Sequence, residues 1–243
     1  MNMPATAPKT AIVLAAGLAT RMRPITDTMP KALIPVAGKP IIDHAIDRLV
    51  AIGVKRIVVN LHYRGDMIAR HLEGRRDVEI VLSPEDELLD SGGGVVNALR
   101  HLGEIFYVIN ADVFWLNGKV PALIRMARAF DEEKMDGLLL MQRTVTAVGI
   151  DGPGDFMIDS AGLLRWRGET EIAPHYFAAV QMLHRRFFGG APAAKFSIKP
   201  YWTRAILAER LYGIVHDGEW YHLETPKGLA EVELRLASRR IER

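Results

Sequence analysis

The chain has 243 residues, a formal net charge of +2 from 31 basic and 29 acidic residues, and no cysteine. The lack of cysteine excludes disulfides and thiolate metal sites. Near-balanced charge gives no general attraction to nucleic acid or to a membrane surface. No apolar run approaches the roughly 20 residues that span a bilayer, and residues 1–9 lack the apolar core of a signal peptide. We therefore expect a cytoplasmic protein.

The first half of the chain alternates strand-like and helix-like segments. We expect strands at residues 10–16, 56–61, 78–82, 105–109 and 137–141, and helices at residues 39–50, 66–73, 94–102 and 121–133. Repeated alternation of this kind predicts an α/β fold, with a mostly parallel central sheet flanked by helices.

After about residue 150 the pattern becomes more mixed. We expect a hairpin of residues 156–158 and 163–166, a strand at 176–183, a helix at 204–210, short strands at 211–215 and 220–223 around a turn at 216–218, and a final helix at 226–239. There is no internal repeat and no clear linker. One domain, residues 1–243, with a smaller mixed C-terminal part fits this pattern best.

The loop after the first strand is rich in small residues and carries positive charge. Residues 15–24 read Ala-Ala-Gly-Leu-Ala-Thr-Arg-Met-Arg-Pro. Ligands of open α/β sheets bind beyond the carboxyl ends of strands, and small residues let the backbone approach a phosphate or a base closely. Arg21 and Arg23 lie in this loop, and Lys31 follows shortly after. The alternative is a structural turn with solvated arginines.

Two other glycine-loop motifs do not match. The dinucleotide fingerprint requires three glycines, whereas Gly17, Ala19 and Met22 occupy the three positions. This mismatch argues against a nicotinamide-dependent oxidoreductase. Gly38-Lys39 is followed by Pro40 and not by Ser or Thr, so it is not a Walker motif.

Two further features follow predicted strands. Asp112 lies just past an apolar strand, where a carboxylate can hold Mg²⁺ against a triphosphate. A turn residue is the alternative for Asp112. The run Gly92-Gly93-Gly94 suits a place where backbone meets a flat ligand such as a base, and a tight turn into the following helix is its alternative.

Together these segments resemble the sugar-1-phosphate nucleotidylyltransferases. The resemblance runs through residues 14–24, Pro30-Lys31, and residues 33–40, 83–85, 91–94, 110–113 and 218–226. It therefore covers nearly the whole chain. Within this family the chain is most similar to the bacterial N-acetylmuramate-1-phosphate uridylyltransferases, through residues 90–94 and 154–156. The mannose-1-phosphate guanylyltransferases are also similar.

The resemblance implies a Rossmann-like nucleotidyltransferase fold, in which residues 1–150 bind the nucleotide and residues 151–243 the sugar. The implied nucleotide-binding residues are Leu14, Ala15, Ala16, Gly17, Ala19, Thr20, Arg21, Gly92 and Gly93. The implied catalytic residues are Arg21 on the β- and γ-phosphates, Lys31 near the reacting phosphates and Asp112 on Mg²⁺ or Mn²⁺. The implied sugar-binding residues are Gly154, Asp155, Glu171 and Gln181.

The implied reaction transfers a nucleoside monophosphate from a nucleoside triphosphate (NTP) to a sugar-1-phosphate and releases pyrophosphate. UTP with N-acetylmuramate-1-phosphate is the expected pair, and GTP with mannose-1-phosphate is the alternative. Such chemistry needs cations, a metal ion and positioning, and no covalent nucleophile. We expect a monomer or a homodimer.

Three residues depart from the family pattern. Ala19 replaces the second loop glycine, and a Cβ there costs on the order of 1–2 kcal/mol if the backbone needs positive φ. Glu224 stands where the family often has glycine and adds a carboxylate near a triphosphate. His222 stands where many relatives have a second metal-binding Asp, and either His222 or Glu224 is a doubtful further metal ligand. Ala19 and Glu224 motivate a rival hypothesis, a catalytically weak regulatory protein that binds nucleotides or nucleotide sugars.

Overall fold

The computed structural model describes residues 7–241, and it is built around one nine-stranded sheet. Residues 1–6, most of the segment expected to lack a signal-peptide core, lie outside the described residues. The strands of this sheet are β1 (Thr10–Leu14), β4 (Arg56–Leu61), β5 (Glu79–Pro84), β6 (Ile105–Asn110), β8 (Gly137–Arg143), β9 (Phe156–Ile158), β10 (Leu164–Trp166), β11 (His175–His184) and β12 (Leu211–Val215). Their order is β10, β9, β11, β6, β1, β4 and β5, with β8 paired to both β11 and β12.

Most of the sheet is parallel, as predicted. β1 pairs in parallel with β4 and β6, β4 pairs in parallel with β5, and β8 pairs in parallel with β12. β11 is inserted between β6 and β8 and runs antiparallel to both. The predicted hairpin is present as β9 and β10.

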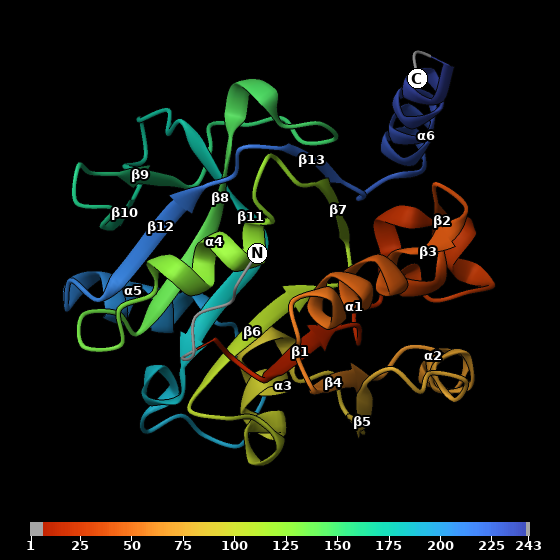
Figure 1. The fold of residues 1–243 in the computed structure, drawn as a ribbon, viewed down its shortest axis with the longest axis horizontal. Helices are drawn as coiled ribbons and strands as arrows, with labels where there is room; N and C mark the ends of the chain where they lie inside the picture. Colours follow the sequence, from red (N-terminus) through yellow and green to blue (C-terminus); the bar gives the residue numbers. More distant parts are fainter. Residues whose placement is uncertain (1–6, 242–243) are drawn as a thin grey trace.

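Helices cover both faces of the sheet (Figure 1). The helices are α1 (Ile41–Ala51), α2 (Gly65–Leu72), α3 (Asp90–Ala98), α4 (Ala122–Ala129) and α5 (Lys199–Leu207). Ala11 and Val13 of β1 belong to the core that α1, α2 and α4 complete. Ile12, on the opposite face, belongs to the core that α3 and α5 complete. The alternation of side chains along β1 thus gives the three layers of an α/β fold.

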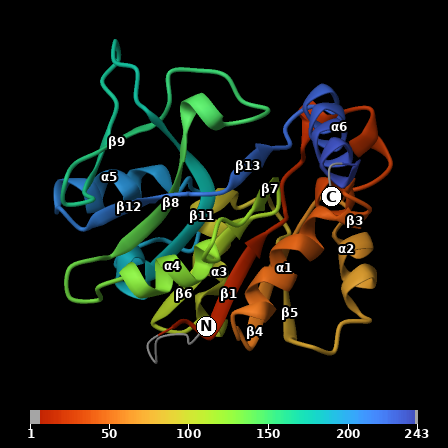
Figure 2. The same ribbon diagram turned by 45° about the horizontal axis from the view of Figure 1, so that its top comes forward.

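The C-terminal segment returns to the N-terminal part of the chain. This segment contains β13 (Glu219–His222) and α6 (Pro226–Ile241), and the elements it meets include β7 (Val113–Leu116) and the pair of β2 (Pro35–Val36) and β3 (Lys39–Pro40). β13 pairs with β7 in a separate small sheet. Figure 2 shows α6 beside β3, and Val232 and Leu236 of α6 pack in one core with Val36 of β2 and Ile41. This return brings the residues after β13 to the first loop.

Short 3-10 helices and the remaining segments complete the described chain. The 3-10 helices are η1 (Thr20–Met22), η2 (Ile25–Asp27), η3 (Lys31–Leu33), η4 (Leu99–His101), η5 (Thr144–Thr146) and η6 (Arg185–Phe188). Across residues 7–241, no helix has the length and apolar character needed to cross a membrane.

Several predicted boundaries were wrong. α3 begins at Asp90 instead of residue 94, so the glycine run lies inside the helix. α5 begins at Lys199 instead of residue 204, with Pro200 in its first turn, a position that suits proline. The predicted strands 211–215 and 220–223 are present but do not pair with each other, because β12 joins β8 and β13 joins β7. β7 was not predicted.

Asp136 links the start of β8 to two segments that follow it in the chain. Its Oδ1 accepts hydrogen bonds from Arg186 Nε at 2.6 Å and Arg210 Nε at 2.7 Å. Burial raises the pKa of Asp136, but these two hydrogen bonds outweigh it and leave the pKa below its usual value. A carboxyl with a depressed pKa stabilises the fold above its unfolded pKa, and that contribution is lost as the pH falls through the folded pKa.

We predict that Asp136→Asn lowers the free energy of unfolding by about 1–2 kcal/mol at pH 7. The difference from wild type should shrink as the pH falls through about 4 and below, where the wild-type carboxyl is protonated too. Urea denaturation at several pH values measures this. Asp66→Asn is the matched control, because the Asp66 side chain is exposed and forms a surface ion pair with Arg70 on α2. A loss that is equal at pH 7 and pH 3 would contradict the assignment.

Candidate active site

The loop after β1 has the conformation that a glycine usually adopts. Ala19 has φ 48° and ψ 43°, in the left-handed region, and precedes η1. Its carbonyl accepts a hydrogen bond from Thr26 Oγ1 at 3.0 Å, and Met22 is fully buried beneath the loop. The positive φ anticipated for this position is therefore present, at a cost of roughly 1–2 kcal/mol for an alanine.

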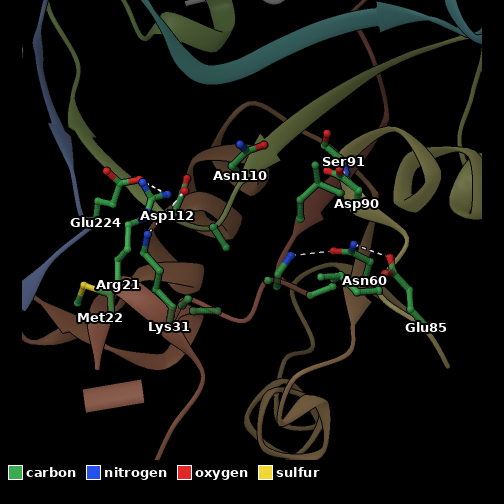
Figure 3. Close-up of a pocket in the computed structure, with 18 of the residues that line it drawn as sticks. Arg21, Met22, Lys31, Asn60, Glu85, Asp90, Ser91, Asn110, Asp112 and Glu224 are labelled. Carbon is green, nitrogen blue, oxygen red and sulfur yellow. Dashed lines mark hydrogen bonds and ion pairs between the residues drawn. The ribbon is translucent and has the colours of Figure 1, made fainter. Parts of the chain in front are cut away.

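Two adjoining cavities, a larger and a smaller one, open beyond the carboxyl ends of the strands. Four side chains form a charged cluster at one end of the larger cavity, namely Arg21, Lys31, Asp112 and Glu224 (Figure 3). Arg21 forms an ion pair with Glu224. Lys31 Nζ lies 3.6 Å from Asp112 Oδ2. The Arg21 side chain is 72% exposed, whereas that of Lys31 is only 13% exposed. The structure thus brings together the three residues predicted to be catalytic, and each of the two cations faces a carboxylate.

One atom of the charged cluster, Asp112 Oδ1, is buried and lacks a hydrogen-bond partner. The same holds for Nδ1 of the neighbouring His222. Burial lowers the pKa of His222 more than nearby Asp112 and Glu224 raise it, so the imidazole is neutral at pH 7. His222 Nδ1 also lies 4.0 Å from Glu224 Oε2. Within residues 7–241, no group of three or more His, Asp or Glu side chains is placed to hold a metal ion by itself.

A buried amide–carboxylate pair lies at the opposite end of the same cavity (Figure 3). Asn60 Oδ1 accepts from Ala15 N at 2.7 Å, and Asn60 Nδ2 donates to Glu85 Oε1 at 2.7 Å. Glu85 Oε2 accepts from Leu89 N at 2.9 Å. This chain joins the first loop to the ends of β4 and β5. Our sequence analysis did not single out Asn60 or Glu85 as site residues, although each stands at the carboxyl end of a predicted strand.

The glycine run has a different role from the one predicted. A Cβ on Gly92 would lie 2.4 Å from Phe196 Cε2, and a Cβ on Gly93 would lie 2.4 Å from the carbonyl oxygen of Ala194. The N–H groups of Gly92 and Gly93 both donate to the Phe196 carbonyl, at 3.0 and 3.1 Å. Neither glycine lines the cavity. These residues therefore accommodate the segment around Phe196, and their N–H groups are not free to bind a base.

The larger cavity has a volume of about 470 Å³. Of the predicted nucleotide-binding residues, those that line it are Leu14, Ala15, Ala16, Gly17, Ala19 and Arg21. Thr20 does not line it. The lining residues that sequence analysis missed include Asn60, Glu85, Leu88, Asp90, Ser91, Asn110 and Lys195. The carboxyl ends of β1, β4 and β6 form its floor.

The smaller cavity, of about 280 Å³, adjoins the larger one. Ser91, Asn110 and Asp112 line both cavities. Much of the remaining wall is aromatic and consists of Phe156, Phe177, Trp166, Trp202 and Trp220. Two ligands bound in these cavities would therefore meet beside the Asp112 carboxylate.

The predicted sugar-binding residues divide into two groups. Asp155 and Gln181 line the smaller cavity. Asp155 Oδ2 accepts from Phe177 N at 3.0 Å, and Gln181 Oε1 accepts from Trp202 Nε1 at 3.0 Å, so both side chains are held in place.

Gly154 and Glu171 lie outside both cavities. Gly154 has φ 75°, and a Cβ there would lie 2.2 Å from the Ala173 carbonyl oxygen, so backbone packing accounts for this glycine. Glu171 is exposed and accepts two hydrogen bonds from Arg165, at 2.7 and 2.9 Å. These bonds lower the pKa of Glu171 to about 2. Glu171 is therefore a charged surface partner of Arg165.

Comparisons with known proteins agree with this geometry. Residues 11–148 match the model of the MobA-like NTP transferase domain. N-acetylmuramate alpha-1-phosphate uridylyltransferase from Caulobacter vibrioides is 40% identical over 237 residues, which cover 95% of this chain and 98% of that protein. Mannose-1-phosphate guanyltransferase from Hypocrea jecorina is 40% identical over 108 residues, 42% of this chain and 30% of that one.

A solved structure supports the fold independently. UDP-glucose pyrophosphorylase, in a complex with UDP-glucose, superposes with a TM-score of 0.78 at 15% identity, over 95% of this chain and 99% of that chain. This likeness concerns the fold alone. Because the domain match covers more than half of the chain and the Caulobacter protein is similar over nearly all of it, the chain belongs to the MobA-like NTP transferase family and is a sugar-1-phosphate nucleotidylyltransferase.

Proposed function

We propose that the protein transfers UMP from UTP to N-acetylmuramate-1-phosphate. The observation that carries this proposal is the pair of adjoining cavities, which share a wall at Asp112. A nucleoside triphosphate in the larger cavity would present its α-phosphorus to a sugar phosphate in the smaller one. The choice of substrates rests on the Caulobacter uridylyltransferase, whose similarity includes the C-terminal half that lines the smaller cavity, whereas the guanyltransferase similarity spans 42% of the chain.

The chemistry suits the side chains present. An oxygen of the sugar phosphate attacks the α-phosphorus in line, and the bond from that phosphorus to the bridging oxygen of the β-phosphate breaks. The attacking oxygen is already anionic near pH 7, so no general base is required. Arg21 and Lys31 would hold the phosphates against their mutual repulsion and position the two reacting atoms. The leaving pyrophosphate remains beside these cations.

Mg²⁺ or Mn²⁺ fits the Asp112 position, because Asp112 Oδ1 is buried and unpaired and Mg²⁺ prefers oxygen ligands. Phosphate oxygens and water would complete the coordination, since Mg²⁺ usually keeps several waters. When bound, the ion supplies charge stabilisation on the phosphates. The location that goes with this reaction is the cytoplasm, where nucleoside triphosphates are made. A monomer or a homodimer stays a prediction.

We predict pyrophosphate release with Mg²⁺ from UTP and N-acetylmuramate-1-phosphate. The measurement uses a grid of UTP, GTP, CTP and dTTP against N-acetylmuramate-1-phosphate, mannose-1-phosphate, glucose-1-phosphate and N-acetylglucosamine-1-phosphate. Turnover confined to GTP with mannose-1-phosphate would replace the proposed substrates. Nucleotide binding without turnover by any pair would support the regulatory hypothesis instead.

We predict that Asp112→Asn reduces kcat/KM by roughly 100- to 1,000-fold, because the variant removes the negative charge that holds the metal against the phosphates. The amide keeps the shape of the side chain, so the stability of the fold should change little. Steady-state kinetics over a range of Mg²⁺ concentrations measures the effect. Asp66→Asn, an exposed change outside both cavities, is the control. A kcat/KM within twofold of wild type would refute the role given to Asp112.

We predict that Glu224→Gln lowers KM for UTP by about two- to fivefold, because it frees Arg21 for the phosphates. The kcat should stay close to wild type. The control is Glu231→Gln, which breaks a comparable exposed pair with Arg235 on α6. A large drop in kcat, with a higher Mg²⁺ concentration needed for activity, would instead indicate that Glu224 binds the metal ion.

A further inference from the structure

A short segment crosses the boundary between the two cavities. We call this segment, residues 194–199, the strap. Lys195 lines the larger cavity, and Ser197, Ile198 and Lys199 line the smaller one. The strap leads directly into α5. Two lysines four residues apart on one segment therefore face two different cavities.

The strap is held by backbone hydrogen bonds to the start of α3. Phe196 O accepts from the N–H groups of Gly92 and Gly93 at 3.0 and 3.1 Å, and Ile198 N donates to Ser91 Oγ at 3.1 Å. Because a Cβ on Gly92 would overlap the Phe196 ring, only glycine permits this approach. The glycine run thus determines where the two lysines are placed.

The two strap lysines differ from the other cations at the site. Each cation of the charged cluster faces a carboxylate of that cluster. Lys195 and Lys199 are both exposed, and neither forms an ion pair with any described carboxylate. The larger cavity is also lined by Glu85 and Asp90, so its carboxylates outnumber its cations. A triphosphate entering this cavity needs further positive charge, and the strap supplies it.

We propose that the strap gives each substrate one cation, so that Lys195 binds the phosphates of the nucleotide and Lys199 binds the phosphate of the sugar. This inference rests on the proposed function in that both ligands are phosphate esters. Because both lysines lie on one segment, their positions relative to Asp112, which lines both cavities, are fixed together. The two bound anions would then be held in the arrangement that in-line attack requires. The same lysines would offset the repulsion between the substrates.

The kinetic test separates the two lysines. Lys195→Met should raise KM for the nucleoside triphosphate about tenfold and leave KM for the sugar phosphate within twofold, and Lys199→Met should do the reverse. Lys195→Arg and Lys199→Arg should recover most of each loss, because they restore the charge. Lys119→Met, an exposed lysine outside both cavities, is the control. Unchanged KM values, or equal increases for both substrates in both variants, would overturn the proposal.

A binding measurement tests the role of Lys195 even if the proposed pair of substrates is wrong. Calorimetric titration with UTP and Mg²⁺ should show about tenfold weaker binding for Lys195→Met and unchanged binding for Lys199→Met. If the wild-type enzyme turns over another pair from the grid, the substrate assignment fails, and the strap is tested with that pair. If no pair turns over, UTP titration alone decides the role of Lys195. Equal UTP affinity in wild type and Lys195→Met would overturn it.

A second variant tests the placement of the strap. Gly92→Ala should raise both KM values together while the lysines remain, because the new Cβ displaces Phe196. Gly74→Ala is the control, since a Cβ there meets nothing within 4 Å. Urea denaturation checks that Gly92→Ala is folded under the assay conditions. A folded Gly92→Ala protein with wild-type KM values would show that the strap does not position the substrates.

Discussion

Parallel pairing of β1 with β4 on one side and β6 on the other determines where the chemistry lies. In this register Leu14 stands opposite both Asn60 and Asn110, so three strands end at one level. Polar groups at this edge then join the loops: Ala15 N donates to Asn60 Oδ1, and Ala111 N donates to Leu14 O at 3.0 Å. Any shift in register would separate the first loop from the turn that carries Asp112.

The charged cluster shows how a site built to gather anions stays stable without them. An unpaired cation or carboxylate that is partly removed from water costs free energy, so each finds a partner within the protein. Lys31, the least exposed of the cluster, faces Asp112, and the more exposed Arg21 pairs with Glu224. In the proposed function, substrate phosphates would displace these carboxylates from Arg21 and Lys31. Because the Arg21 side chain is 72% exposed, water screens its pair with Glu224, and that exchange costs less there than at the less exposed Lys31.

The parts of the fold and site that could be predicted depend on local signals. Apolar runs identified the parallel strands, and the rule that ligands lie beyond strand ends placed Arg21 and Asp112 together. The glycine run was misinterpreted because its neighbour, Phe196, lies about a hundred residues away, and steric demand of that kind leaves no trace in local propensity. Asn60 and Glu85 were missed for the same reason, since a buried amide–carboxylate pair is defined only by its tertiary contact.

Of the three residues that depart from the family pattern, Ala19 has the smallest expected effect on activity. The loop reaches the left-handed conformation with alanine in place of glycine, and the hydrogen bond from Thr26 holds its carbonyl there. The left-handed backbone at Ala19 lowers the stability of the folded protein by roughly 1–2 kcal/mol. Burial of Met22 in the surrounding apolar core offsets this loss. Because the loop after β1 keeps this conformation with alanine, one of the two arguments for a regulatory protein is weakened. The remaining argument is the Glu224 carboxylate, which pairs with Arg21 and would compete with phosphate for it; such competition weakens phosphate binding and leaves the other side chains for nucleotidyl transfer in place.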